Sequence, residues 1–378
     1  MQPKRILKST AAAAALMTAG PVVSAVPAEA GNWAGGNQNG VVMSGRIVRS
    51  LLYQHDGENS ELFHVDGATD SSRLRWVITG QMTENVQVGG LIEMNIPLSN
   101  PAGAASFDAS GNGTYVNGDT KEWGIRHTKV DFKHRSMGAF SIGQSSVASD
   151  GAYEQHLGGL AHIGVGACDY GCKTVFTHSS NGAASTVQVG KVASSYDGGR
   201  DDRIRYDSSS MGGFKGAFSV QDGNSWDLAL THGGKFGSVQ LASAFAYRHL
   251  AEDDKAVKAI YGGSVAAKHD SGLNGSFGLS KKQAKDHSTS VDGYHWHLAV
   301  GYDANLTDLG QTALTFVYGR NEDSINDGDK SNYMKFVVNQ DLPAGIDVFA
   351  AYSQFNYDPV GPDYNDISQF LVGTRLRF

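Results

Sequence analysis

The sequence is poor in the residues that interrupt or cross-link a chain. Only 8 of its 378 residues are proline and only 2 are cysteine. The prolines after residue 30 all fall between apolar segments, where a hydrogen-bonded sheet tolerates them, so no proline breaks a candidate strand. Long apolar runs are also absent. Since a membrane-spanning helix needs about 20 apolar residues, the sequence excludes a helical membrane protein.

Catalytic and cofactor motifs are missing as well. The sequence has no Walker motif, no His-Glu-x-x-His, no dinucleotide fingerprint in a βαβ context and no Gly-x-Ser-x-Gly in a strand-to-helix setting. With a formal net charge of −7, the chain is mildly acidic and lacks the basic stripe of a nucleic-acid-binding protein. We therefore expect neither an enzyme nor a nucleic-acid binder, and no cofactor.

The first thirty residues have the pattern of a secretory signal peptide. Lys4, Arg5 and Lys8 form a basic start, an apolar stretch runs from 11 to 19, and Ala-Glu-Ala at 28–30 supplies a small-x-small cleavage site. The apolar stretch is too short to span a bilayer as a helix. The sequence predicts a signal peptide over residues 1–30 and a single domain over 31–378.

Apolar and polar residues alternate with a period of two in many segments. Successive strand side chains face opposite sides of a sheet, so such a segment has one apolar and one polar face. Between 294 and 302 the second face carries only His, Ala and Gly. The apolar face there consists of Tyr294, Trp296, Leu298, Val300 and Tyr302. The same pattern recurs near Leu74, Val86, Trp226, Val239, Leu273, Leu314, Met334 and Phe370.

The alternating segments predict an all-β fold, a transmembrane antiparallel β-barrel of about 16 strands. Each segment is about nine to eleven residues long, enough to cross a bilayer when tilted. Short connections, such as Gly233-Gly234, alternate with long ones, such as 321–331. A soluble β-sandwich also alternates, but its polar face would be charged rather than rich in Gly, Ala, Ser and Thr. Ile125 and Val130 fall out of phase, which predicts a bulge there.

Five stretches resemble, in their order and spacing, the general Gram-negative porin family. Residues 41–54 look like the family's first strand, and 72–74 look like its second. Residues 137–144 resemble the strand entering the constriction loop, and 202–208 the strand leaving it. The stretch 373–378 is similar to the closing strand, which ends on an aromatic residue, here Phe378.

The resemblance implies a trimeric, 16-stranded barrel in the outer membrane that conducts ions and small hydrophilic solutes passively. Its partners would be outer-membrane lipid and lipopolysaccharide, and Phe378 would be a residue of assembly. A long constriction loop after strand 5, about 145–200, would fold into the lumen. Gln144 stands where the family usually has arginine, and Ser209 where it usually has proline. These departures and the length of the loop leave the size and charge of the pore open.

Charged residues on inward strand phases are the candidates for lining the pore. The basic candidates are Arg46, Arg73, Arg75, Arg126, Arg203 and Arg205. The resemblance places the loop opposite such a wall. The acidic candidates are Asp150, Glu154 and Asp169 in the loop, and Glu93 on a nearby strand. Opposed charges would set up a transverse field that favours dipolar solutes. The alternative is that each arginine is solvated and paired locally, since exposed ion pairs contribute only about 0–1 kcal/mol.

Two cysteines lie close together inside the expected loop. Three residues separate Cys168 from Cys172, and Gly171 among them can supply a turn, so a small disulfide hairpin is feasible. Such a disulfide would stiffen the loop and fits an oxidising compartment. The alternative is a metal site with His162 or His178 as further ligands. Zinc sites usually show more ligands at regular spacing, so no metal is predicted.

The function predicted is a non-specific diffusion channel. The alternatives are a solute-selective porin, favoured by the long third loop, and a structural or adhesive barrel whose outer loops act. The acidic residues of the outer loops, such as those in 321–329, would concentrate cations at the mouth, so we expect a preference for cations despite the basic wall. The same run is a candidate for divalent cations that bridge lipopolysaccharide. A solvated loop is the alternative, because no ordered calcium-ligand spacing is present.

Overall fold

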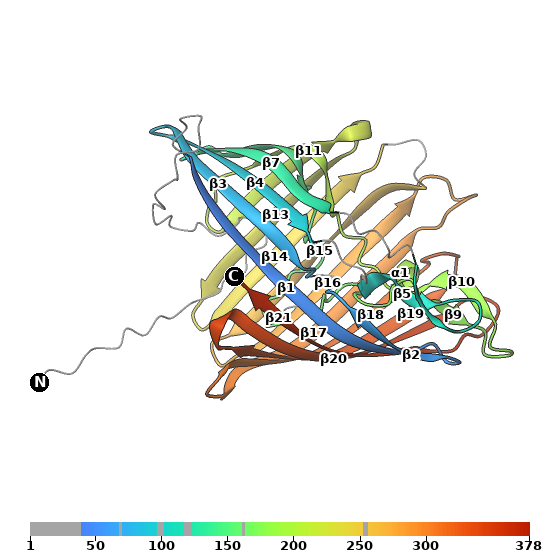
Figure 1. Ribbon diagram of the computed structural model, residues 1–378. Coiled ribbons are helices and arrows are strands. Elements are labelled where there is room, and N and C mark those ends of the chain that lie inside the picture. Colours follow the sequence, from blue (N-terminus) through green and yellow to red (C-terminus); the bar gives the residue numbers. More distant parts are fainter. Residues whose placement is uncertain (1–38, 68–69, 97–101, 117–122, 161–162, 252–255) are drawn as a thin grey trace, which may run out of the picture.

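A computed structural model describes residues 39–67, 70–96, 102–116, 123–160, 163–251 and 256–378. The predicted signal peptide lies outside this part of the chain, as does His162. In the described part, strands that follow one another around a ring pair antiparallel and close into a barrel of 16 strands (Figure 1). The ring runs β1 (Gly40–His55), β3 (Arg73–Thr83), β4 (Val86–Asn95), β7 (Gly124–His134), β8 (Gly138–Ser146), β11 (Arg200–Asp207), β12 (Phe214–Gln221), β13 (Trp226–Phe236), β14 (Val239–His249), β15 (Val257–His269), β16 (Leu273–Ala284), β17 (Gly293–Thr307), β18 (Gly310–Glu322), β19 (Lys330–Leu342), β20 (Ile346–Asp358) and β21 (Ile367–Arg377).

The first and last strands close the ring. β21 pairs with β1 in a register that sets Arg377 opposite Arg46 and Ser368 opposite His55. One residue further, the backbone N–H of Gly45 donates to the carbonyl of Phe378 at 2.7 Å, and the N–H of Phe378 donates back to Gly45 at 3.0 Å. These pairings close the ring and confirm the predicted fold class. A closed ring leaves no sheet edge whose backbone groups would be unsatisfied in lipid.

The partner strand on the other side of β1 is interrupted. β3 pairs with β1 as far as Arg46, and the short strand β2 (Ser60–Val65) pairs with it from Ser50 onward. Between these two stretches the hydroxyl of Ser72 bonds both backbone groups of Val48, at 2.9 Å to the N–H and 3.2 Å to the carbonyl. A side chain therefore replaces the backbone pairing that the interruption removes.

The two faces of the wall differ as the alternation predicts. On β17 the outward side chains, namely Tyr294, Trp296, Leu298, Val300 and Tyr302, are 36–49% exposed. The inward His295, His297 and Ala299 are at most 2% exposed. In an outer-membrane barrel the exposed apolar band is the surface that lipid covers.

The predicted irregularity is present in β7. The register with β4 shifts between Glu93, which faces His127, and Met94, which faces Ile125. Arg126 is therefore the extra residue of a β-bulge, and it leaves Ile125 and Val130 on the same, outer face despite their odd spacing.

The connections also follow the prediction, with one correction. Gly233-Gly234 is not a turn but lies inside β13, and the chain reverses at Gly237-Ser238. Gly237 adopts φ +58°, a conformation that glycine reaches without the strain of a side chain, so the turn forms there. Longer connections lie on the opposite rim. They carry η1 (Ala102–Ala104), β5 (Ala105–Phe107), β6 (Gly113–Tyr115) and η2 (Asp222–Asn224), while η3 (Pro343–Gly345) forms a short turn.

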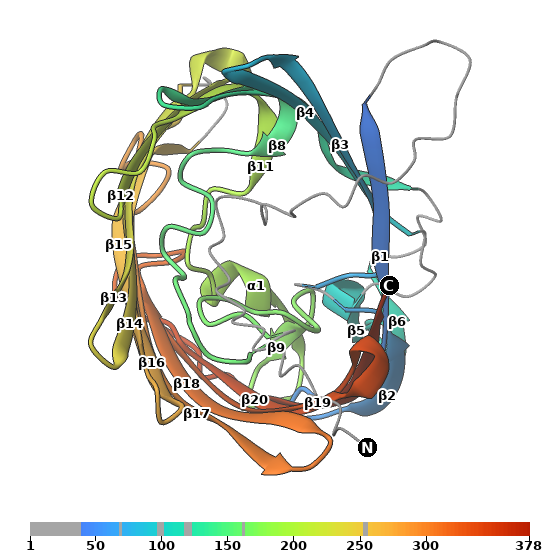
Figure 2. The same cartoon turned by 90° about the vertical axis from the view of Figure 1, so that its left-hand side faces the viewer.

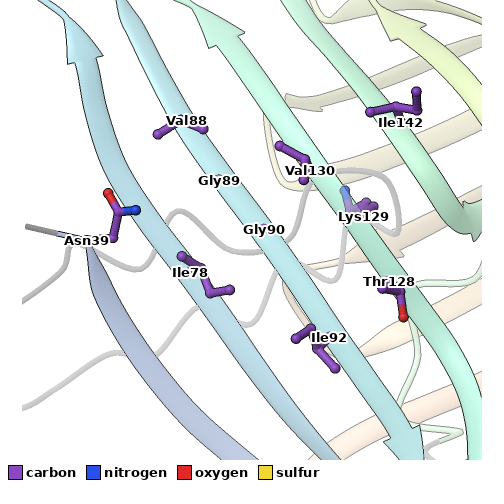
Figure 3. A pocket seen from close by; sticks show the side chains of 10 residues that line it. All are labelled: Asn39, Ile78, Val88, Gly89, Gly90, Ile92, Thr128, Lys129, Val130 and Ile142. Atoms are coloured by element: carbon purple, nitrogen blue, oxygen red, sulfur yellow. The ribbon is translucent and has the colours of Figure 1, made fainter. Parts of the chain in front are cut away.

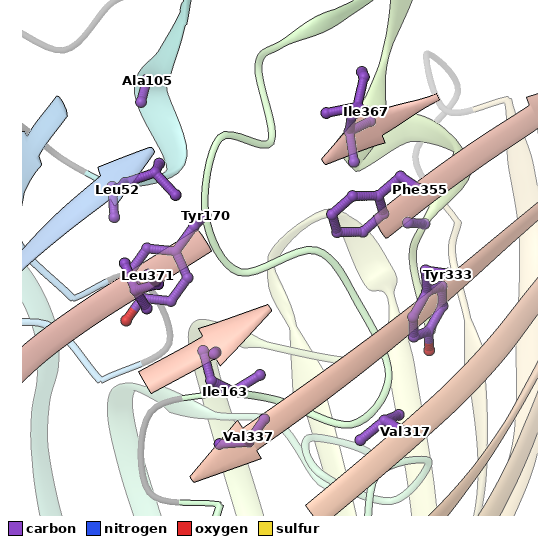
Figure 4. Packing of buried hydrophobic residues seen from close by; sticks show 14 of the residues in the cluster. Leu52, Ala105, Ile163, Tyr170, Val317, Tyr333, Val337, Phe355, Ile367 and Leu371 are labelled. Atoms are coloured by element: carbon purple, nitrogen blue, oxygen red, sulfur yellow. The ribbon is translucent and has the colours of Figure 1, made fainter. Parts of the chain in front are cut away.

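Residues 147–199, here called the inner loop, connect β8 to β11, and the described residues among them lie inside the ring (Figure 2). This segment contains β9 (Val175–Thr177), β10 (Ala184–Gln188) and the short helix α1 (Val189–Val192). Its apolar side chains pack on inward residues of β1 and β18–β21 in one buried cluster, in which Ile163 and Tyr170 lie beside Val337 and Leu371 (Figure 4). No helix of the described residues is long and apolar enough to cross a membrane.

Candidate functional site

Four predicted pore residues meet on the inner wall. Glu93 of β4 accepts from Arg73 Nη1 and Arg126 Nε, each at 2.9 Å from its Oε1. Arg75 Nε lies 3.9 Å from Oε2, and His127 Nε2 lies 3.9 Å from Oε1. The bulge of β7 explains the crowding, because it turns Arg126 and His127 toward the same carboxylate. Glu93 thus lies among the arginines, not across a gap from them.

A second carboxylate, which sequence reasoning missed, joins this cluster. Asp70, in the interruption between β2 and β3, forms ion pairs with Arg46, with Arg73 at 3.7 Å and with Arg375 of the last strand. Arg375 also pairs with Asp347 of β20. Asp70 follows Gly67-Ala-Thr and resembles an ordinary loop residue in the sequence. Nothing local signals that two strands distant in sequence, β1 and β21, converge on it beside β3.

Arg203 and Arg205 lie apart from this cluster, at the root of the inner loop. Arg203 Nε donates to the carbonyl of Ser146 at 3.2 Å, and Arg205 Nη1 donates to the carbonyl of Val147 at 2.6 Å. Arg205 is also paired with Asp207 at 2.7 Å. Both arginines are at most 6% exposed, so in this structure they hold the end of β8 and the start of the loop.

Hydrogen bonds attach the inner loop to strand after strand of the wall. Beyond the bond from Arg205 to Val147, they continue at Ala148, whose N–H donates to Ser219 of β12 at 2.9 Å, and reach Gln54 of β1, which donates to Thr174 at 2.5 Å. Between these ends the wall residues bonded to the loop are Asp227, Arg248, Ser264, Ser276, Ser280, Asp303, Asn321, Ser331, Tyr333, Lys335 and Gln369. The loop therefore covers the arc from β12 round to β1, away from Glu93 on β4.

The acidic candidates of the loop are used within its own packing. Asp150 accepts the N–H of Gly199 at 3.1 Å, and Glu154 accepts the hydroxyl of Ser195. Burial raises the pKa of Glu154, which the bond from Ser195 partly offsets. The neighbouring Asp197, which bonds Gly151 N–H at 2.9 Å, has a pKa raised well above its usual range by burial and by the adjacent carboxylates.

Asp169, the third acidic candidate, faces a buried cation on the wall. Its Oδ2 lies 2.7 Å from Nζ of Lys335, and their side chains are 5% and 1% exposed. Lys335 was not predicted as a site residue. The sequence did contain a signal. Tyr333 and Val337, the neighbours of Lys335 on the inward side of β19, are apolar, whereas a strand that faces water would carry polar residues there.

The two cysteines are joined in the structure. The sulfurs of Cys168 and Cys172 form a disulfide with Cα atoms 5.7 Å apart, one residue from Asp169. Because both sulfurs belong to the disulfide, they cannot be the thiolate ligands that the alternative metal site needs. Among the residues described, no group of three or more His, Cys, Asp or Glu is arranged to hold a metal ion.

The outer face has a shallow groove of about 380 Å³ across β3, β4, β7 and β8 (Figure 3). Its lining includes Ile78, Val88, Ile92, Val130 and Ile142, and Gly90 leaves the hollow between them. These side chains belong to the apolar, outward face, so the groove is not part of a path through the barrel.

The geometry is that of a channel wall, and comparison with known families decides the assignment. Residues 10–359 match the family described as Gram-negative porin. The chain belongs to the Gram-negative porin family. It is an outer-membrane porin, a water-filled channel through which ions and small hydrophilic solutes diffuse passively. None of the curated proteins matches the porin in sequence.

Solved structures share the fold of this porin at low sequence identity. The anion-selective porin from Comamonas acidovorans is 12% identical with a TM-score of 0.60, covering 90% of this chain and 100% of its own. OmpT of Vibrio cholerae, with its loop L8 deleted, is 13% identical with a TM-score of 0.59, covering 90% and 99%. OmpF of Salmonella typhi, in complex with daunomycin, is 12% identical with a TM-score of 0.56, covering 89% and 97%.

Proposed function

We propose that solutes pass between the inner loop and the wall formed by β3, β4 and β7, and that this passage favours anions. The hydrogen bonds of the loop run along the arc from β12 to β1, so the loop and the Glu93 cluster occupy different parts of the lumen. An inward loop that covers one arc leaves the other arc as the lining of the path.

The charge balance of that lining is the observation that carries the proposal. On and beside β3, β4 and β7, four arginines share two carboxylates: Arg46, Arg73, Arg75 and Arg126 with Asp70 and Glu93. The guanidinium side chains of Arg46 and Arg75 are 24% and 33% exposed, whereas Glu93 is 8% exposed. The positive ends therefore meet the solute, and a ring of one sign of charge selects the opposite ion.

This proposal differs from the cation preference that the acidic outer loops predict. Charges on exposed loops are screened over roughly 8–10 Å at physiological salt. Charges on a narrow, partly desolvated wall are screened less, so the wall should govern which ions cross.

Reversal potentials in planar bilayers under a KCl gradient test the proposal. We expect the sign for chloride preference in the natural protein, and a shift toward potassium in Arg75→Gln. Lys235→Gln is the matched control, because Lys235 is 57% exposed and paired with Asp270 at the rim. A potassium-selective natural protein, or equal shifts in both variants, would contradict the proposal. Blockade by one solute at low concentration would instead favour the solute-selective alternative.

The assembly proposed is a homotrimer. One structure of similar fold is described as the trimer form of Vibrio cholerae OmpT, and the apolar outer face of this barrel offers surface for such contacts. Conductance steps in groups of three, with a trimer mass in mild detergent, are the expected results. We also propose that this porin has no catalytic activity; turnover of peptide or ester substrates by the purified protein would refute that.

A further inference from the structure

We infer that Lys335 is the positioning residue that holds the inner loop against the wall and so fixes the width of the channel. Its place in the fold is unusual for a porin wall. Lys335 lies in the middle of β19, on the inward phase, yet its side chain is only 1% exposed. A lysine in a water-filled lumen would keep its ammonium in water, so a buried one indicates a specific set of partners.

All three N–H groups of the ammonium are directed at one short segment of the loop. Nζ donates to the carbonyl of Gly164 at 2.7 Å, to the carbonyl of Ala167 and to Oδ2 of Asp169 at 2.7 Å. An ammonium has three donors and no acceptor, so its capacity is fully used. A single side chain of the wall thus gathers residues 164–169 around itself.

Residues 164–169 are also held together by a hydrogen bond within the loop. Oδ1 of Asp169 accepts the N–H of Gly164 at 3.0 Å, so the same carboxylate joins both ends of the segment while its other oxygen meets Lys335. Tyr333, two residues away on β19, donates its hydroxyl to the carbonyl of Val165 at 2.9 Å. The disulfide of Cys168 and Cys172 begins next to Asp169.

Removing the ammonium would leave the partners in an unfavourable state. Asp169 would lose the ammonium of Lys335, and two carbonyls would lose a donor; breaking a buried pair at one partner is destabilising. Ile163 and Val165 would still pack in the apolar cluster, at 4% and 2% exposure. The loop should therefore stay in the barrel but move, rather than leave it.

Single-channel recording of the full-length porin with Lys335→Met tests this role. Met keeps most of the volume and removes the charge, and we expect at least a roughly two-fold rise in the frequency of transient closures, because the ion pair between the wall and the loop is lost. Lys330→Met, a matched change at an exposed position of the same strand, should behave as the natural protein does. Reduction of the disulfide should raise the closure frequency more in Lys335→Met than in the natural protein.

A second readout separates positioning from general stability. The cost of the lost ion pair falls on a loop segment that can open locally without unfolding the wall. The thermal unfolding of the barrel should therefore be nearly the same in Lys335→Met and Lys330→Met, because the wall hydrogen bonds of β19 are backbone pairs that neither change removes. Closures no more frequent than in Lys330→Met would overturn the inference. If Lys335→Met does not fold, Asp169→Asn is the second variant: more frequent closures would support the role of Lys335, and an unchanged record would overturn it.

Discussion

Glu93 is the carboxylate that the arginines of the inner wall surround. Its two oxygens face Arg73, Arg75 and Arg126, and the first two of these project from neighbouring positions on β3. Like charges so close together repel one another unless an anion lies between them. The carboxylate therefore holds the guanidinium groups in a fixed arrangement and also cancels part of their field.

Replacing Glu93 by Gln should make the channel more selective for anions. The amide keeps the shape but removes one negative charge, and we expect the chloride-to-potassium permeability ratio to rise roughly two-fold, with a larger effect at low salt. Reversal potentials measure the ratio. Glu322→Gln serves as control, since Glu322 forms a single pair with Arg320 and is 43% exposed. A shift toward potassium in Glu93→Gln would argue against our assignment of the path.

Gly45 is a second residue whose identity is set by its close contacts. A Cβ atom there would lie 2.6 Å from Cζ of Phe378 and 2.8 Å from the carbonyl oxygen of Arg73. The ring of the terminal phenylalanine thus occupies the space that a side chain would need. The predicted role of Phe378 in assembly remains a prediction, and its place over Gly45 gives a way to test it.

Gly45→Val should weaken the closure of the barrel. Overpacking of this kind costs about 1–3 kcal/mol, so the folded protein should melt at a lower temperature, as followed by its heat-dependent mobility in gels. Gly40→Val, on the same strand, is the control, because a Cβ there would meet only Thr79, at ordinary distances of 3.5 Å and 3.9 Å. Equal melting of the two variants would show that the close packing at Gly45, against Phe378 and Arg73, is unimportant.

At the scale of elements, the inner loop carries a titratable group at its contact with the wall. His156 Nδ1 lies 3.3 Å from Oγ of Ser276 on β16, and its Nε2 has no hydrogen-bond partner among the described residues. Burial lowers the pKa of His156 to about 4, an effect that Asp303 opposes and Lys268 reinforces. The imidazole is therefore neutral in the folded loop at neutral pH.

Acidification should loosen the loop through His156. Because the pKa of His156 is lower in the folded than in the unfolded state, the neutral imidazole stabilises the folded loop above the unfolded pKa of about 6.5. This stabilisation is lost as the pH falls through about 4. Closures should become more frequent between these values, and His156→Gln should reduce the change. His287→Gln, at a 70% exposed position, should not. Glu154 and Asp197 titrate with the opposite sign but are common to all three proteins, so an unchanged pH profile in His156→Gln would refute the role.

The sequence predicted those elements whose pattern is imposed by lipid. Outside the barrel only apolar side chains are tolerated, so strict alternation located β17, and the broken phase of Ile125 and Val130 located the bulge. The interruption beside β1 was not predictable. It depends on the bonds between Ser72 and Val48, 24 residues apart, and polar residues there look like an ordinary loop.

The candidate site was predicted less well than the fold for a related reason. Alternation assigns a side chain to the inside of a barrel but does not say whether water or another segment meets it. Arg46 and Arg75 lie on the inner wall beside Asp70 and Glu93, whereas Arg205 and Asp169 are held in packing around the inner loop. Which inward residues the loop covers follows only from its three-dimensional path.

At the scale of the whole molecule, the apolar outward face of the barrel makes the stability of the protein depend on its surroundings. Leu298 lies on the outward face of β17, 47% exposed and between Trp296 and Tyr302. In the outer membrane this surface meets hydrocarbon, and a guanidinium near the middle of the bilayer costs about 2–4 kcal/mol.

Leu298→Arg should therefore lower the free energy of unfolding by about 2–4 kcal/mol in lipid vesicles. Urea unfolding followed by tryptophan fluorescence measures the change. Val360→Arg, in the connection between β20 and β21 and 75% exposed, introduces the same side chain outside the band and should have little effect. Equal losses in both variants would mean that Leu298 does not face lipid.

The seam between Gly45 and Phe378 has a consequence for biogenesis. Neighbouring strands elsewhere in the ring follow one another along the chain, the inner loop being the longest connection between them, but this seam brings together segments more than 300 residues apart. Until both are present, β1 and β21 each expose a row of unpaired amides that could capture another chain. The nascent polypeptide must therefore be shielded in an open form, and insertion into the membrane is tied to the moment when the circle is completed.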